Sequence, residues 1–106
     1  MENYLFQENL ENLLTEIPAD SIISRSVLKN EQVDVTLFGF AAGQELTEHT
    51  SSRPAILHFI KGKARLTLGE DEKTAEGETW VYMPPRLPHS ITAETPVIML
   101  LILLRA

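Results

Sequence analysis

The sequence predicts an all-β domain, a sandwich or barrel of short strands with one short helix in front of it. Two observations support this prediction. Segments rich in β-branched residues recur between residues 22 and 104, and glycines, prolines and polar turns separate them. The chain of 106 residues shows no internal repeat and no linker, so we expect one domain that spans residues 1–106.

The first 20 residues predict a helical segment. Apolar side chains recur there at helical spacing, at Leu10, Leu13, Leu14 and Ile17. Pro18 ends the pattern, because a proline cannot continue a helix. We therefore expect a short amphipathic helix over residues 8–16, packed on a larger body.

The remainder of the chain predicts strands over residues 22–28, 33–40, 55–68, 79–83, 90–93 and 96–104. Residues 55–68 alternate most clearly. Their apolar face consists of Ile60, Ala64, Leu66 and Leu68, and basic or polar side chains form the other face. Trp80 is expected in the core, as large aromatic side chains usually are.

The last predicted strand is apolar on both faces, since every residue from 97 to 104 is Val, Ile, Met or Leu. A strand in a small barrel needs only one buried face. Either the N-terminal helix or a second subunit has to cover the other face. We expect a homodimer, because large exposed apolar patches usually mark an interface.

Charge and composition exclude several classes of function. The net charge is −6, from 15 acidic and 9 basic residues, so neither a nucleic acid nor an anionic membrane surface is an expected partner. The chain has no cysteine, which excludes disulfides and thiol catalysis. The N-terminus lacks the basic start and apolar stretch of a secretory signal, so we expect a cytoplasmic protein.

The chain has three histidines, His49, His58 and His89, and two of them lie in recognisable surroundings. His49 follows Gly43 after five residues, and a further glycine stands thirteen positions on. His89 follows a strand and a proline-rich corner that begins at Pro84.

At these residues the sequence resembles the cupin superfamily of small β-barrels. One signature of that family runs Gly, five residues, His-x-His, three or four residues, Glu, six residues, Gly. The other runs Gly, five residues, Pro-x-Gly, two residues, His, three residues, Asn. The residues that match these signatures are Gly43, His49, Gly62, Pro84 and His89, with Gly77 displaced by one position. The resemblance implies a double-stranded β-helix (jelly-roll) barrel with its core over residues 33–105.

The resemblance also implies a metal inside the barrel, but the ligand pattern is incomplete. Ser51 stands where the second His would be, and Ala55 where the Glu would be. Arg86 replaces the turn glycine. Only His49 and His89 match the family's ligand positions, and two imidazoles leave most of a coordination shell to water. The alternative is that both are retained without a metal and bond to each other, to water or to Ser51.

His58 offers a third ligand by strand parity. If the inward alternation of residues 60–68 extends back without a bulge, Ile56 and His58 point into the barrel. Three imidazoles with open positions are a plausible first shell for Zn, Mn, Fe, Ni or Cu. The competing interpretations are a buried histidine bonded to a neighbour, or a surface histidine.

Two functions from different classes follow. One is a metal-dependent enzyme of the oxygenase type, whose catalytic residues and substrate the sequence does not identify. The other is a non-catalytic module that binds or senses a small sugar or organic acid. Arg53 and Arg86 are candidates to hold a carboxylate or phosphate at the mouth of such a cavity, although arginines more often face solvent.

Overall fold

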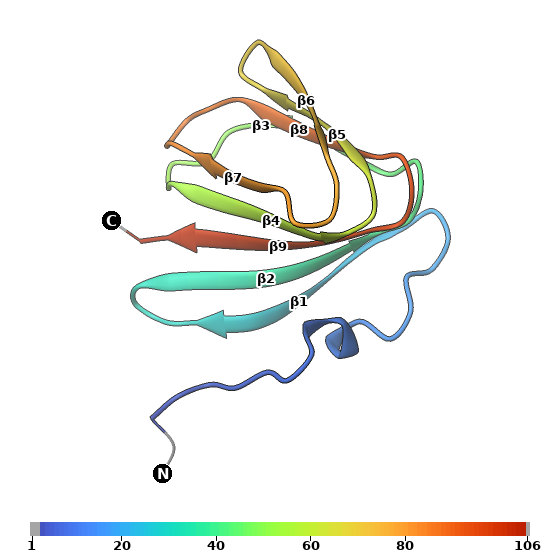
Figure 1. The fold of residues 1–106 in the computed structure, drawn as a ribbon. Coiled ribbons are helices and arrows are strands. Elements are labelled where there is room, and N and C mark those ends of the chain that lie inside the picture. Colours follow the sequence, from blue (N-terminus) through green and yellow to red (C-terminus); the bar gives the residue numbers. More distant parts are fainter. Residues whose placement is uncertain (1–2, 106) are drawn as a thin grey trace.

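The computed structural model describes residues 3–105 and shows two antiparallel sheets that face each other around one core (Figure 1). The elements are η1 (Leu10–Leu13), β1 (Ile22–Lys29), β2 (Val33–Phe40), β3 (Glu45–His49), β4 (Ala55–Lys61), β5 (Ala64–Leu68), β6 (Asp71–Ala75), β7 (Trp80–Met83), β8 (His89–Ala93) and β9 (Val97–Leu104). The five-stranded sheet has the order β1-β2-β9-β4-β7, and the four-stranded sheet the order β3-β8-β5-β6. The predicted all-β class is confirmed, and the amphipathic helix predicted over residues 8–16 is reduced to one 3-10 turn.

That helical turn is shorter than predicted. It is a 3-10 turn of four residues, started by the Asn9 side chain, which accepts a hydrogen bond from the backbone N–H of Glu11. The chain is extended again at Leu14. The reason is tertiary packing, because Leu14 and Ile17 lie directly against Gly39 of β2, and a Cβ on that glycine would lie 2.9 Å from the Ile17 side chain. Burial of these two side chains outweighs the helical spacing of the segment.

The predicted strand over residues 55–68 is two strands in different sheets. Gly62, at φ +96°, forms the corner between β4 and β5 and lies under the backbone of Pro96. A register shift follows Phe59 in the pairing of β4 with β9. In β5 the predicted parity is right, since Ala64 and Leu66 are buried. In β4 it is reversed.

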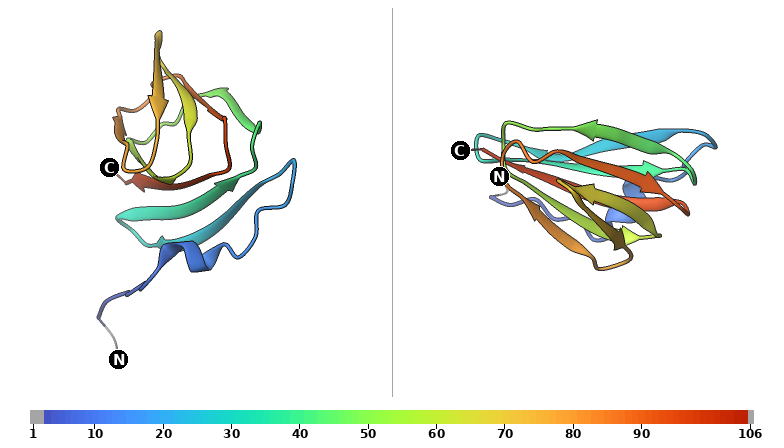
Figure 2. Two further views of the ribbon diagram at one scale, coloured as in Figure 1. Left: turned by 45° about the vertical axis from the view of Figure 1, so that its right-hand side comes forward. Right: turned by 90° about the horizontal axis from the view of Figure 1, so that it is seen from above.

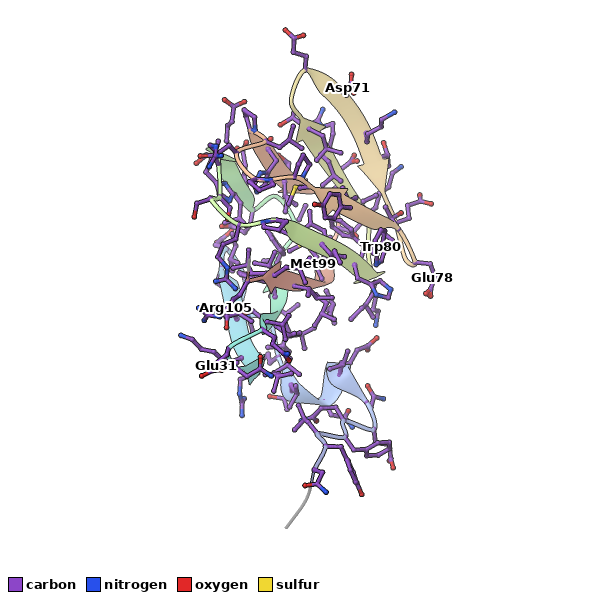
Figure 3. The ribbon with its side chains drawn as sticks, turned by 90° about the vertical axis from the view of Figure 1, so that its left-hand side faces the viewer. Glu31, Asp71, Glu78, Trp80, Met99 and Arg105 are labelled. Atoms are coloured by element: carbon purple, nitrogen blue, oxygen red, sulfur yellow. The ribbon has the colours of Figure 1, made fainter. Side chains whose placement is uncertain are left out.

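The core lies between the two sheets. Its largest fully buried side chains are Phe40, Phe59, Leu37, Leu57, Leu66, Ile91, Met99 and Val97. Met99 lies inside the molecule in Figure 3, while Trp80 points outward. Trp80 is 58% exposed, so its predicted place in the core is wrong. The cause is the reversed alternation of β4. Trp80 is the cross-strand neighbour of His58 and therefore lies with it on the outer face of the sheet.

The outer face of the five-stranded sheet is only partly covered. Leu14 and Ile17 lie over Gly39, whose cross-strand partner Ile98 is only 9% exposed, and Leu37 on the same face is fully buried. Further along β9, Leu100, Ile102 and Leu104 are half-buried on this same face. The last strand was predicted to need a cover on its second face as well. The N-terminal segment of the same chain covers that face at only one end of β9. No helix within residues 3–105 is long and apolar enough to cross a membrane.

Candidate functional site

His49 and His89 lie side by side on the inner face of the four-stranded sheet. His49 ends β3, His89 begins β8, and the two are cross-strand partners whose ring centroids are 4.2 Å apart. A register shift after Leu46 brings His49 opposite His89. His89 is buried, at 6% exposure, whereas His49 is exposed. The pair thus has one buried and one open side.

Both imidazoles make the same hydrogen bond through Nδ1. The Nδ1 of His49 lies 2.8 Å from the carbonyl oxygen of Thr47, and the Nδ1 of His89 lies 2.9 Å from that of Leu87. A carbonyl oxygen can only accept, so Nδ1 carries the proton and donates it. In the neutral imidazole, Nε2 then holds a free lone pair. Histidines that bind metals have this second contact, which fixes both tautomer and ring orientation.

His58 does not join this pair. Its strand neighbours Leu57 and Phe59 are buried, and its own side chain is 38% exposed on the outer face of the five-stranded sheet. The prediction that His58 points into the barrel is therefore wrong. The physical reason is the corner at Gly62 together with the register shift after Phe59, which break the alternation that the prediction extended from β5 into β4.

On the outer face, His58 has a different neighbour. Its Nε2 lies 4.0 Å from Oε1 of Glu78, a carboxylate that is 85% exposed. Within residues 3–105, no group of three or more His, Asp or Glu side chains is placed to hold one metal ion. A site with three protein ligands therefore does not fit the donors that the structure brings together.

At the two positions where the cupin pattern has further ligands, this chain has Ala55 and Ser51, and both serve the fold. Ala55 is buried at 3% exposure in the core. Ser51 uses its hydroxyl to accept a hydrogen bond from the backbone N–H of Arg53, at 3.1 Å. Neither residue supplies a carboxylate or an imidazole. Any further ligands of a metal held by the histidine pair are therefore expected to be water or a bound small molecule.

Arg53 is not free to bind an anion at the mouth. Its guanidinium donates to Asp34 at 3.0 Å and to the carbonyl oxygens of Leu103 and Leu104, each at 3.1 Å. Arg105 donates to the same carboxylate. The hydrogen bond from Arg53, aided by that from Arg105 and opposed by burial, lowers the pKa of Asp34 below its ordinary value. This cluster fastens the end of β9.

Arg86 lies in the loop that precedes His89. Its backbone N–H donates to the carbonyl oxygen of Ser51 at 2.7 Å, which ties the loop after His49 to the loop before His89. Arg86 has φ +67°, the left-handed conformation that suits the glycine of the cupin pattern. Among the described residues, its exposed guanidinium makes no hydrogen bond or ion pair that competes with a ligand.

The carbonyl groups of Thr47 and Leu87 are parts of the site that sequence reasoning missed. Each stands two residues before the histidine that it contacts. A backbone carbonyl leaves no mark in the residue types, so spacing alone does not identify it. A shared offset of two residues is visible only once the turn geometry is known.

Solved structures with the same fold confirm the architecture. A cupin superfamily protein from Desulfitobacterium hafniense matches with a TM-score of 0.87 at 24% identity, over 96% of this chain and 95% of that one. A conserved protein of unknown function from Streptococcus pyogenes matches with a TM-score of 0.86 at 23% identity, over 99% and 91%. A DMSP lyase from Ruegeria pomeroyi matches with a TM-score of 0.74 at 16% identity, over 81% and 48%.

These likenesses define the class of the molecule: the chain has the cupin fold, as the sequence resemblance implied. No protein-family model matches the sequence, and no curated protein is similar to it in sequence. At these identities the likeness concerns the fold, and function has to be argued from the site.

Proposed function

We propose that this cupin-fold protein binds a divalent transition metal through Nε2 of His49 and Nε2 of His89 and holds a small molecule at that metal. The observation that supports the proposal is the matched Nδ1 contact of both rings with backbone carbonyls. Two neighbouring imidazoles with the same nitrogen left free are a donor set that Zn, Mn, Fe, Ni or Cu accepts. His58, predicted as a third ligand, is not part of this site.

The two histidines fit a metal in different ways. His89 is buried and held by its carbonyl contact, so it provides the rigid ligand. His49 is exposed at the end of β3 and provides the ligand on the open side. A bound divalent metal would act as a Lewis acid with several positions left to water or a ligand. Two protein ligands alone make such binding weaker than that of a closed structural site.

Between the two classes of function, the donor set favours a binding module over an oxygenase-type enzyme. An enzyme would need a third protein ligand to keep the metal in place during turnover. Within residues 3–105, no acidic side chain joins the histidine pair. Reversible capture of a small sugar or organic acid at an open metal needs no such support. The fold is shared with an enzyme, the lyase named above, but at 16% identity that likeness does not transfer an activity.

The test is metal uptake by protein purified without chelators and without an affinity tag. Dialysis against each of the five metals, followed by elemental analysis and calorimetric titration, should give about one metal per chain for the natural sequence. His49→Ala and His89→Ala should each weaken binding by at least about tenfold. His58→Ala is the matched control, because it removes an imidazole that lies on the outer face of the five-stranded sheet, away from the histidine pair.

Two results would overturn the metal proposal. One is that none of the five metals binds. The other is that His58→Ala weakens binding as much as His89→Ala does. A thermal-shift screen of small sugars and organic acids, with and without the metal that binds, then separates the two classes. Stabilisation without turnover of the same compounds supports the binding module, and turnover supports the enzyme.

A further inference from the structure

Large exposed apolar side chains occur in two places among the described residues. One place is the segment before η1, where Tyr4 and Phe6 are each 72% exposed and Leu5 is 53% exposed. The other is β7, at the edge of the five-stranded sheet, where Trp80 is 58% and Tyr82 52% exposed. Scattered single apolar residues on a surface need no explanation, but two clusters of aromatic side chains do.

The first cluster belongs to an arm, residues 3–6, that leaves the body of its own chain. Residues 7–11 line a groove of about 390 Å³ with His58, Ile60 and Glu78, so the chain is still beside its own outer face there. Further toward the N-terminus the backbone runs away from the sheets, as Figure 1 and the left view of Figure 2 show. The side chains of the arm therefore have no surface of their own chain to cover them.

The second cluster continues into the uncovered part of the outer face. Tyr82 is the cross-strand neighbour of Ile56, which pairs in turn with Ile102 of β9. On the far side of Ile102 lies Val35 of β2. All four residues are uncharged and lie on the outer face of the sheet. In a chain of net charge −6, such a stretch is where two copies can approach without strong repulsion.

We propose that two copies of this chain pair through the outer faces of their five-stranded sheets, and that each arm crosses to lie over Trp80 and Tyr82 of the other copy. A second copy is the fitting occupant because every chain carries both halves of the contact, the arm and the uncovered face. A two-fold arrangement then satisfies both and closes, which leaves no apolar patch for further growth. The proposal is independent of the histidine pair.

The exposed area is of the size that such a pair needs. A stable interface buries about 800 Å² per partner. Fully exposed aromatic side chains bury about 150–250 Å² each, and the four aromatic residues of the two clusters are half to three-quarters exposed, which gives about 400–600 Å² per chain. Leu5 of the arm and the half-buried side chains of β9 supply the remainder.

The oligomeric state is the first part of the test. Sedimentation velocity at tens of micromolar should give the mass of a dimer for the natural sequence. The double variant Tyr4→Ser/Phe6→Ser should shift the population to monomer, and Asn3→Ser, a polar substitution in the same arm, should not. A monomer for the natural sequence would overturn the proposal, and a dimer that survives the double variant would overturn the role of the arm.

Cross-linking is the second part and separates exchange of the arm from its folding back. The chain has no cysteine, so a single cysteine can be placed in each of two variants, Leu5→Cys and Glu78→Cys, which keep all four aromatic residues. Mixed and oxidised, they should form a disulfide between different chains. Leu5→Cys mixed with Asp71→Cys is the control, because Asp71 lies at the far tip of the molecule from Glu78 and Trp80 (Figure 3). Equal yields in both mixtures would contradict arm exchange.

Discussion

His89 and His58 are the same residue type on two strands of one barrel, and their surroundings differ in every respect. His89 is 6% exposed, faces inward, and has its Nδ1 bonded to a backbone carbonyl. His58 is 38% exposed, faces outward, and lies beside an exposed carboxylate. The comparison teaches that the chemistry of a histidine here is decided by which face of which sheet carries it. For His58, that face follows from the corner at Gly62 and the register shift after Phe59.

The corner itself offers the largest expected effect. A Cβ on Gly62 would lie 2.0 Å from the carbonyl oxygen of Pro96, and the residue has φ +96°. Gly62→Ala therefore adds conformational strain and a clash with backbone, each worth about 1–3 kcal/mol, for a loss of about 4 kcal/mol in the free energy of unfolding. Urea unfolding measures it.

Gly43→Ala is the matched control for that substitution. Gly43 also has a left-handed backbone, φ +85°, but no atom lies within 4 Å of its Cβ position. The variant should lose only the conformational part, about 1–2 kcal/mol. Equal losses of unfolding free energy in the two variants would mean that Gly62 does not lie close under Pro96. The explanation of the outward orientation of His58 by a corner at Gly62 would then fail.

The reversed parity of β4 has its own test in two neighbouring residues. Leu57 is 2% exposed and belongs to the core, whereas Ile56 lies half-buried on the outer face. Leu57→Ala should lower the free energy of unfolding by about 3 kcal/mol, because it leaves a cavity, and Ile56→Ala by about 1 kcal/mol. If Ile56→Ala proves the more costly change, His58 points inward after all.

At the histidine end, one substitution should stabilise the protein. Arg86 holds a left-handed backbone at φ +67°, so Arg86→Gly removes strain and costs only the extra flexibility of glycine in the unfolded chain. The expected net gain is about 0.5 kcal/mol by urea unfolding. A loss of stability would show that the Arg86 side chain makes a contact of its own.

The smallest expected effect concerns pH. The Asp34 carboxylate has its pKa lowered in the folded chain, first by the hydrogen bond from Arg53. A carboxylate whose pKa is lower in the folded state stabilises the fold above its unfolded pKa, ordinarily near 3.8, and loses that contribution as the pH falls through the folded value. Asp34→Asn should flatten this acidic part of the stability profile between neutral pH and about pH 3. An unchanged profile would mean that the cluster is open to solvent.

Much of the fold follows from the sequence, and the limits have specific causes. The alternation in residues 64–68 predicted the buried face of β5 correctly, because that strand is regular. The same rule failed for His58, since a register shift and a corner are set by long-range pairing with β9. The helical spacing near Leu10 predicted a helix over residues 8–16, whereas packing against Gly39 leaves only one 3-10 turn.

The site was predictable only in outline. The resemblance to the cupins implied that His49 and His89 lie together, and the two are cross-strand partners in the structure. The departures at Ser51 and Ala55 also indicated that two usual ligands are missing. The orientation of the two rings depends on the backbone carbonyls of Thr47 and Leu87, and no residue type encodes that.

The central claim is that two of the three histidines form a metal-binding pair with Nε2 free, and long-range ¹H–¹⁵N NMR of the imidazole nitrogens tests it most directly. With only three histidines, the signals are assigned by single His→Gln variants. We predict that His49 and His89 hold their proton on Nδ1, and that Zn²⁺ shifts the Nε2 signals of these two residues while that of His58 stays in place. A proton on Nε2 of His89, or a Zn²⁺ response at His58 alone, would contradict the account.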